Sequence, residues 1–322
     1  MTADRLLWVD ILKLTGLFFV ILGHIASPFS GFIYSWHMPF FFFLSGLFMK
    51  KLTNMTELKC RIIKDFKNLM IPFYVFSLLA LLAESIKRTL LNRRGLDYFY
   101  EIRGVLYDMS IESLSNHYGF VLWFLSALFF AKIIVNLLMY ICKDALYFFP
   151  ALSILIFTLS FNVDLPFSID IALNAAFWVS LGILYKRWIN YFSVNFILFF
   201  SVLLIVFIFY FWGVPALDMA RLNYSHPLVN VVWALSVIVF LVCLGRLLSG
   251  YFEDKRCFID FISPYFLFIF AFHTYTNNIG YLLAMKIADG FWLVHLLLSL
   301  VFIAFFVFIR SKFGTNGFLK YV

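Results

Sequence analysis

Residues 5–48 read RLLWVDILKLTGLFFVILGHIASPFSGFIYSWHMPFFFFLSGLF. Two long apolar runs are joined here by a short connection, and few polar residues interrupt them. An ionisable residue near the centre of a membrane helix costs at least about 2.5–3.5 kcal/mol, so such residues are rare and usually functional. This stretch nevertheless carries Asp10, Lys13, His24 and His37. We therefore expect two membrane helices whose polar side chains take part in the function.

The composition of the whole chain also indicates a membrane protein. Of its 322 residues, 64% are hydrophobic and 13% are charged, and the mean hydropathy is +0.96. Soluble domains are about 45–50% apolar and about 25% charged. A formal net charge of +8 could suggest a nucleic-acid partner, but the positions of the basic residues assign this charge to membrane orientation. We expect membrane lipids as neighbours and no nucleic acid as a partner.

Apolar runs long enough to span a bilayer, which takes about 20 residues, recur along the chain. They predict an all-α membrane protein, a bundle of about ten transmembrane helices that forms a single domain over residues 1–322. The expected spans are 8–27, 32–49, 70–90, 119–141, 145–161, 169–185, 193–212, 227–248, 262–284 and 290–310. Most Lys and Arg residues of the short connections fall on one side if both termini are cytosolic. Residues 84–118 are an exception, because they carry five basic residues on the side expected to face outward.

The segment 50–69, between the second and third expected spans, is basic and amphipathic. A helix of this kind can lie on the anionic inner leaflet, where each nearby basic residue contributes about 1 kcal/mol. The same basic residues could instead form a rim that attracts a phosphorylated cofactor. Both interpretations remain open at the level of the sequence.

Helical geometry places the polar residues of the first run on one face. At 100° per residue, Lys13 and His24 differ by about 20° and Asp10 and His24 by about 40°, so all three are predicted to point into the bundle. Asp10 and Lys13 are three residues apart and can form an ion pair. Lys13 and His24 lie about 16 Å apart along the axis. This separation suits an elongated reactant, with phosphates held by the cation and a histidine acting as general base at the far end. The alternatives are an ion pair that only sets orientation and a histidine bonded to a loop.

Four further polar or aromatic residues are candidates for a site. His37 opens the second run at the same end as His24, so the two imidazoles could form a base and its orienting partner, or could be two interfacial residues. Ser45 is interpreted first as part of a close-packing notch between helices and second as a contact for a substrate hydroxyl. Trp123 is typical of an interface anchor. His273 lies within an expected span, either as a satisfied core group or in the wall of a polar cavity.

Motifs in these runs resemble those of a known family. WVDILKLTGLFFVILGH (Trp8 to His24) and WHMPFFFFLSGLF (Trp36 to Phe48) are similar to motifs of acyltransferase family 3, membrane proteins that include bacterial O-acetyltransferases of surface polysaccharides. NLMIPFYVF (Asn68 to Phe76) and WFLSALF (Trp123 to Phe129) match as well, so the resemblance covers nearly the whole chain. Lys13 stands where many members have arginine.

The resemblance implies a multi-pass enzyme of the bacterial inner membrane. Its donor would be acetyl-CoA or another acyl-CoA, used from the cytosol, and its acceptor a hydroxyl of a cell-surface polysaccharide or of its lipid-linked precursor. The family's essential histidine would be His24, and its basic partner would be Lys13, oriented by Asp10. We expect no metal in this reaction.

Substrate binding is expected to involve His37, Ser45, Trp123 and His273, with His37 and His273 on the acceptor side. A rival hypothesis is a transporter or flippase of a lipid-linked sugar that does no covalent chemistry and uses the polar residues as a path. A third is a non-catalytic scaffold of a polysaccharide synthesis complex. The chain has no inverted repeat and no matched pair of helices broken by Gly or Pro, which are the features that would favour a transporter.

Overall fold

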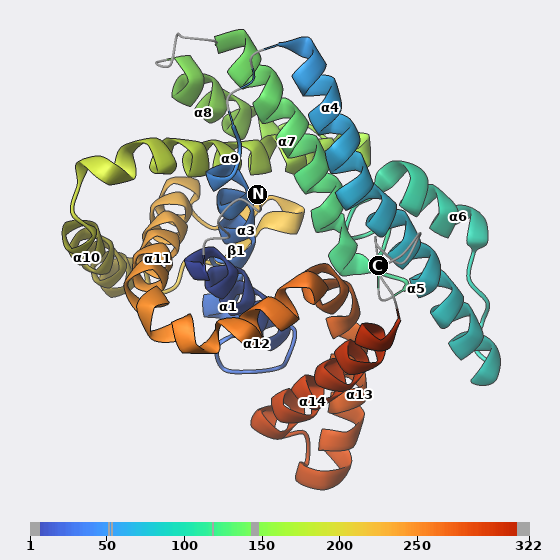
Figure 1. Cartoon of the computed structure of the whole chain (residues 1–322). Coiled ribbons are helices and arrows are strands. Elements are labelled where there is room, and N and C mark those ends of the chain that lie inside the picture. Colours follow the sequence, from blue (N-terminus) through green and yellow to red (C-terminus); the bar gives the residue numbers. More distant parts are fainter. Residues whose placement is uncertain (1–6, 51, 53, 118, 143–147, 314–322) are drawn as a thin grey trace. The chain divides into compact units, whose positions relative to one another are not determined.

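A computed structural model describes residues 7–50, 52, 54–117, 119–142 and 148–313. This part of the chain is almost entirely helical (Figure 1). The α-helices are α1 (Leu7–Gly23), α2 (Ser30–Tyr34), α3 (His37–Leu47), α4 (Met55–Asp65), α5 (Ile71–Leu90), α6 (Tyr98–Arg103), α7 (Trp123–Cys142), α8 (Phe148–Ser160), α9 (Ile169–Trp188), α10 (Val194–Trp212), α11 (Pro227–Leu248), α12 (Arg256–Ile262), α13 (Phe266–Ala288) and α14 (Trp292–Lys312).

Short π and 3-10 turns extend or join these helices, and two very short strands pair with each other. The π turns are η1 (Phe66–Met70) and η2 (Gly104–Asp108). The 3-10 turns are η3 (Phe120–Leu122), η4 (Pro166–Ser168), η5 (Ile189–Tyr191), η6 (Met219–Arg221), η7 (Ser249–Lys255) and η8 (Ser263–Tyr265). The strands are β1 (Leu217–Asp218) and β2 (Asn223–Tyr224).

Seven helical stretches of the described chain are long and apolar enough to cross a membrane. They are Met55–Leu90, Phe120–Cys142, Pro166–Trp188, Val194–Trp212, Pro227–Asp254, Arg256–Ala288 and Trp292–Lys312. Each contains most or all of one of the spans expected from the sequence, namely the third, the fourth and the sixth to tenth, and Met55–Leu90 also includes residues 55–69, which were expected to lie between spans. The all-α membrane class is therefore confirmed.

The other three expected spans are also helical but shorter. Helix α1 has 17 residues, α3 has 11 and α8 has 13. At 1.5 Å per residue an eleven-residue helix covers about 16 Å, roughly half of the hydrocarbon thickness. The second apolar run is shorter than expected because it is divided, with α2 ending at Tyr34 and α3 beginning at His37. The count of ten spans and the cytosolic termini stay predictions.

The chain forms two compact units. The first unit comprises Met1–Phe41, Trp188–Asp218 and Tyr224–Gly314, and the second comprises Phe42–Arg187, Met219–Asn223 and Thr315–Val322. In the first unit α1 packs against α11 and α13, α10 packs against α11, and α13 and α14 form an antiparallel pair. The turn of this pair uses left-handed backbone at Asp289 (φ 48°) and Gly290 (φ 77°). This packing places the end of α1 beside α13.

In the second unit the backbones of α3 and α9 approach closely. A Cβ added at Gly46 would overlap the carbonyl oxygen of Val179, and a Cβ added at Gly182 would overlap that of Phe43. Only glycine allows two helices to come so near, which is the small-residue packing known from membrane helices. The prediction of a close-packing notch beside Ser45 is confirmed.

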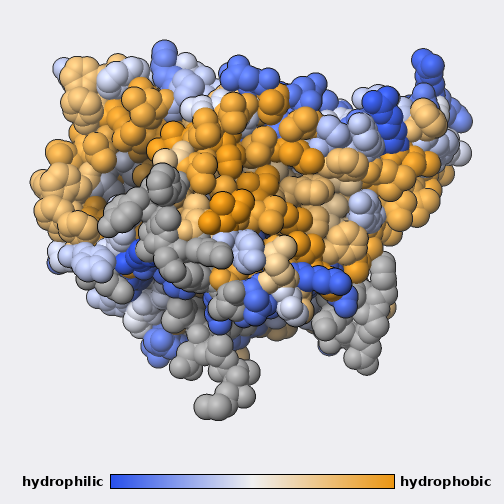
Figure 2. Space-filling model, turned by 90° about the horizontal axis from the view of Figure 1, so that it is seen from above, coloured by the Kyte–Doolittle hydropathy of each residue, from blue (hydrophilic) through white to orange (hydrophobic). Residues whose placement is uncertain are grey.

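Apolar side chains are abundant on the surface as well as in the core. Figure 2 shows hydrophobic residues over a broad part of the face in view. Helix α10 exposes many of its aromatic side chains, among them Phe199, Phe207 and Phe211. Such a surface is costly in water and favourable in lipid, which agrees with a multi-pass membrane protein.

Candidate active site

Three histidines and one tyrosine of the first unit lie together, and we call these four residues the histidine cluster: His24, Tyr34, His37 and His273. His24 directly follows α1, Tyr34 ends α2, His37 begins α3 and His273 lies within α13. The ring centroids of His24 and His273 are 5.1 Å apart. The Tyr34 hydroxyl lies 3.3 Å from Nδ1 of His24, and the Tyr34 ring lies edge-on to His37 at 5.2 Å.

A tight return of the chain between α1 and α2 makes this arrangement possible. The hydroxyl of Ser30 donates hydrogen bonds to the carbonyl oxygens of Ile25 and Ser27, each at 3.0 Å. These bonds hold the first residue of α2 against the loop that leaves α1. The last residue of α2, Tyr34, is thereby brought back to His24.

The cluster has a buried and a more accessible part. His37 and His273 are 3% and 0% exposed, and the Nδ1–H groups of these residues donate to the carbonyl oxygens of Ile33 (2.9 Å) and Phe270 (2.6 Å). With Nδ1 protonated, Nε2 of each neutral ring can only accept a hydrogen bond. The His24 side chain is half-buried and Tyr34 is 37% exposed. His24 and Tyr34 are therefore the members that a reactant can reach from outside.

At the other end of α1 the predicted ion pair is present. Nζ of Lys13 lies 3.7 Å from Oδ1 of Asp10, with Asp10 buried and the Lys13 side chain 44% exposed. Because α1 is continuous from Leu7 to Gly23, Lys13 and His24 are separated by about 16 Å along its axis. Lys13 is thus more exposed than the sequence predicted, because all three polar residues of this helix were expected to point into the bundle.

The second unit contains a pocket of about 420 Å³ with a cationic lining. This volume lies in the range of about 300–1,000 Å³ that is typical of small-molecule sites. Helices α4 and α7 contribute four polar residues that contact one another or lie side by side. Lys132 forms an ion pair of 2.5 Å with Asp65, and a nitrogen of Arg61 lies 3.5 Å from Oδ1 of Asn136. We call this the cationic pocket, and its lining residues are Ser45, Phe48, Met49, Lys50, Arg61, Lys64, Asp65, Asn68, Lys132 and Asn136.

The comparison with family models is decisive for the class of this protein. The family model described as an acyltransferase domain, that of acyltransferase 3, matches residues 6–312. The chain belongs to acyltransferase family 3. Among curated proteins and among solved structures, no significant match is found. The protein is therefore a multi-pass membrane acyltransferase.

The remaining predicted site residues of this acyltransferase lie in the second unit. Ser45 lines the cationic pocket and donates its hydroxyl to the carbonyl oxygen of Phe42 at 2.7 Å. Trp123 is 4% exposed and packs against the rings of Phe42 and Phe124. The expected contacts of Ser45 and Trp123 with a substrate stay predictions.

Sequence reasoning missed two residues of these sites. Lys132 is an ionisable residue within the apolar run WFLSALFFAKII. The high free energy of an ionisable residue in a membrane helix, which identified Lys13 as a candidate, would also have identified Lys132. Tyr34 carries no such signal, because tyrosine is common at membrane interfaces. Only the return of α2 towards the end of α1 gives its hydroxyl a partner.

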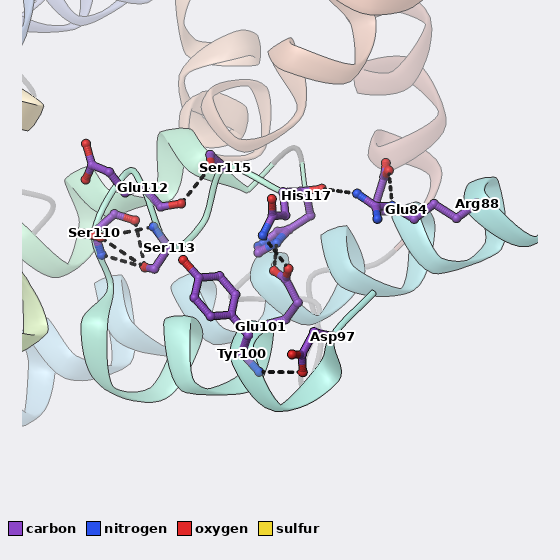
Figure 3. A network of polar contacts seen from close by, with 11 residues as sticks. Glu84, Arg88, Asp97, Tyr100, Glu101, Ser110, Glu112, Ser113, Ser115 and His117 are labelled. Carbon is purple, nitrogen blue, oxygen red and sulfur yellow. Dashed lines mark hydrogen bonds and ion pairs between the residues drawn. The ribbon is translucent and has the colours of Figure 1, made fainter. Parts of the chain in front are cut away.

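A third polar group of the acyltransferase connects α5 to the segment that follows it, because the Arg88 guanidinium donates to the carbonyl oxygen of Asn116 at 3.5 Å (Figure 3). Glu84 pairs with Lys87 at 2.7 Å and with Arg88 at 3.0 Å, so two of the basic residues that opposed the expected orientation have a buried counter-charge. Glu101 accepts from Nδ1–H of His117 at 3.0 Å and from the Asn116 amide at 2.8 Å.

His117 and Glu101 are both almost fully buried. Burial lowers the pKa of His117 below its ordinary value, and the hydrogen bond with Glu101 opposes this effect without cancelling it. Nε2 of His117 is packed against Gly119, where a Cβ would clash with the ring. With no space at that nitrogen for a reactant, this group fastens the segment 97–117 to α5 and is not a reaction centre.

Proposed function

We propose that this membrane acyltransferase transfers an acyl group, in the main acetyl, from acyl-CoA to a hydroxyl of a cell-surface polysaccharide or of its lipid-linked precursor in the bacterial inner membrane. The observation that carries the proposal is the accessible His24, which contacts the Tyr34 hydroxyl and a second, buried imidazole. A histidine is the usual base for the proton of an alcohol, because its ordinary pKa lies near neutrality.

The reaction needs one base and one leaving group. His24 takes the proton of the acceptor hydroxyl as the hydroxyl oxygen attacks the thioester carbonyl carbon of the donor. The C–O bond of the new ester forms, the C–S bond breaks, and the electron pair leaves with the sulfur of CoA. The proton held by His24 neutralises the thiolate or returns to solvent, which restores the base.

The cationic pocket supports a phosphorylated donor. The lining of the pocket has four basic residues and one acidic residue, Asp65, so positive charge is in excess. The basic residues are Lys50, Arg61, Lys64 and Lys132. Phosphate oxygens of CoA accept charge-assisted hydrogen bonds, which are about twice as strong as neutral ones. The outer charges, Lys64 and Lys50, are exposed and available to a ligand. Lys13, at the end of α1 remote from His24, is a separate candidate for binding a phosphate.

Replacing Lys64 by glutamine should raise the KM for acetyl-CoA about tenfold and leave kcat within about twofold. A charge-assisted hydrogen bond contributes about 1.5–3 kcal/mol, and solvent around the exposed Lys64 reduces this value. The measurement is initial rate against acetyl-CoA concentration, with purified protein in lipid vesicles.

The matched control is Lys59→Gln, since Lys59 lies on the same helix and is exposed but does not line the pocket. S-acetyl-pantetheine, which lacks the phosphates, provides a second control, and its KM should not respond to Lys64→Gln. An equal rise in KM for both donors, or for both lysine variants, would show that the pocket does not bind phosphate.

The transferase itself is tested with the same vesicles, radiolabelled acetyl-CoA and the glycan fraction of the host membrane. The expected result is labelled ester on the glycan, formed in step with free CoA and removable by mild alkali. A transporter would carry the glycan across the vesicle membrane with acetyl-CoA unchanged. A scaffold would do neither. Either of these outcomes contradicts the proposal.

A further inference from the structure

Tyr34 lies between two histidines of the cluster. Its hydroxyl oxygen is 3.3 Å from Nδ1 of His24, and its ring contacts His37 edge-on, with 81° between the ring planes. The ring planes of Tyr34 and His24 are also nearly perpendicular, at 88°. The sequence left open whether His37 orients His24. In the structure Tyr34 contacts both histidines.

We propose that Tyr34 is a positioning residue that holds His24 in the tautomer and orientation needed for its action as a base, a role that rests on the proposed function. In this arrangement Nδ1–H of His24 donates to the Tyr34 hydroxyl oxygen, and the lone pair for the acceptor's proton is on Nε2. A neutral imidazole carries one N–H and one lone pair, so a partner at one nitrogen decides the state of the other.

The stabilisation of His24 by the Tyr34 hydroxyl increases during the reaction. When His24 takes a proton it becomes an imidazolium, and the bond from Nδ1–H to the hydroxyl oxygen becomes charge-assisted and stronger. An interaction that strengthens on the way to the transition state raises kcat, whereas one that is equal in ground and transition states changes KM alone. The Tyr34 hydroxyl is therefore expected to act on kcat.

Other titratable groups face this part of the cluster. They are His37 of α3, His273 of α13, and Asp218 of β1, whose charge acts on Tyr34. His37 and His273 are tied through Nδ1 to carbonyl oxygens of the preceding turn. Tyr34, by contrast, comes from a separate short helix and contacts His24 through a hydroxyl that phenylalanine lacks. Tyr34→Phe thus removes the proposed interaction and keeps the ring packing.

The test measures kcat and KM for acetyl-CoA between pH 3 and pH 9, in vesicles supplied with a saturating amount of the host glycan fraction. Tyr34→Phe should lower kcat about tenfold and leave KM within about twofold, which is the effect of about 1.4 kcal/mol on the transition state alone. The acid limb of its rate profile should move to lower pH, because an imidazolium without its acceptor loses its proton more readily.

Tyr281→Phe is the matched control, because Tyr281 is another exposed tyrosine whose ring lies 5.6 Å from a histidine, His295, outside the cluster. It should behave as the unsubstituted protein. A Tyr34→Phe protein with unchanged kcat and pH profile would overturn the positioning role, and so would one whose KM and kcat change without a shift of the acid limb. His24→Gln, assayed in parallel, separates this result from failure of the proposed function: full activity of that variant removes His24 as the base and Tyr34 with it.

Discussion

Replacing His24 by alanine should lower kcat for acyl transfer by about 10²–10⁴-fold, the range that a positioned general base contributes. Neither of the other two histidines of the cluster can replace it as a base without a change of structure, because His37 and His273 are buried and tied through Nδ1 to carbonyl oxygens. The measurement is labelled acetyl transferred from acetyl-CoA to the host glycan fraction per mole of folded protein. His24→Gln should show the same loss, since glutamine preserves much of the volume and cannot take a proton at neutral pH.

His226→Ala provides the matched control for the loss of a histidine. His226 precedes α11, its side chain is exposed, and it is not in the histidine cluster. Both alanine variants should reach the membrane in equal amounts and unfold at temperatures near that of the unsubstituted protein. A His24→Ala protein that is folded and retains more than about a third of the kcat would exclude a base at this position, since general bases contribute at least about 100-fold.

Replacing Gly46 by alanine should destabilise the second unit by about 3 kcal/mol or more. Overpacking of a core typically costs about 1–3 kcal/mol when side chains can shift. At Gly46 the obstacle is the carbonyl oxygen of Val179, and the reciprocal obstacle at Gly182 is that of Phe43, so α3 and α9 must move apart as whole helices. The measurement is the midpoint of thermal unfolding of the purified protein in detergent, and Gly182→Ala should show a loss of the same size.

Gly95→Ala is the control in the same unit, because a Cβ at Gly95 meets no atom within 4 Å and its backbone is not in the left-handed region. It should unfold at the temperature of the unsubstituted protein, or slightly above, because alanine restricts the unfolded chain more than glycine does. If Gly46→Ala unfolded at the same temperature as Gly95→Ala, the close approach of the two helices would be refuted.

Much of the fold and part of the site could be predicted from local patterns. Apolar runs of about 20 residues identify spanning helices because unpaired backbone polar groups are too costly in lipid. The pair of Asp10 and Lys13 follows from a spacing of three residues within one helix. The notch at Gly46 follows from a small residue in an otherwise bulky run. All of these depend on residues close together in the chain.

Long-range contacts could not be predicted in this way. His273 is 249 positions after His24 in the sequence, and periodicity within one helix contains no information about which helix packs against it. The ion pair of Lys132 with Asp65 joins α7 to α4 across 67 positions and completes a pocket that neither helix forms alone. The run 32–49 is apolar at most positions, so its mean hydropathy does not show that α2 and α3 are separate helices.

The sequence by itself therefore determined the membrane class, the family and the identity of His24 and Lys13 as candidates, because composition, run length and motif spacing are properties of the chain. The tertiary structure decided which groups surround His24 and where cations collect. The hydroxyl of Tyr34 and the imidazole of His273 reach His24 because a tight loop returns α2 to the end of α1 and α13 packs against α1. Those contacts depend on packing between helices, which is set by the shapes of whole surfaces rather than by the spacing of residues along one run.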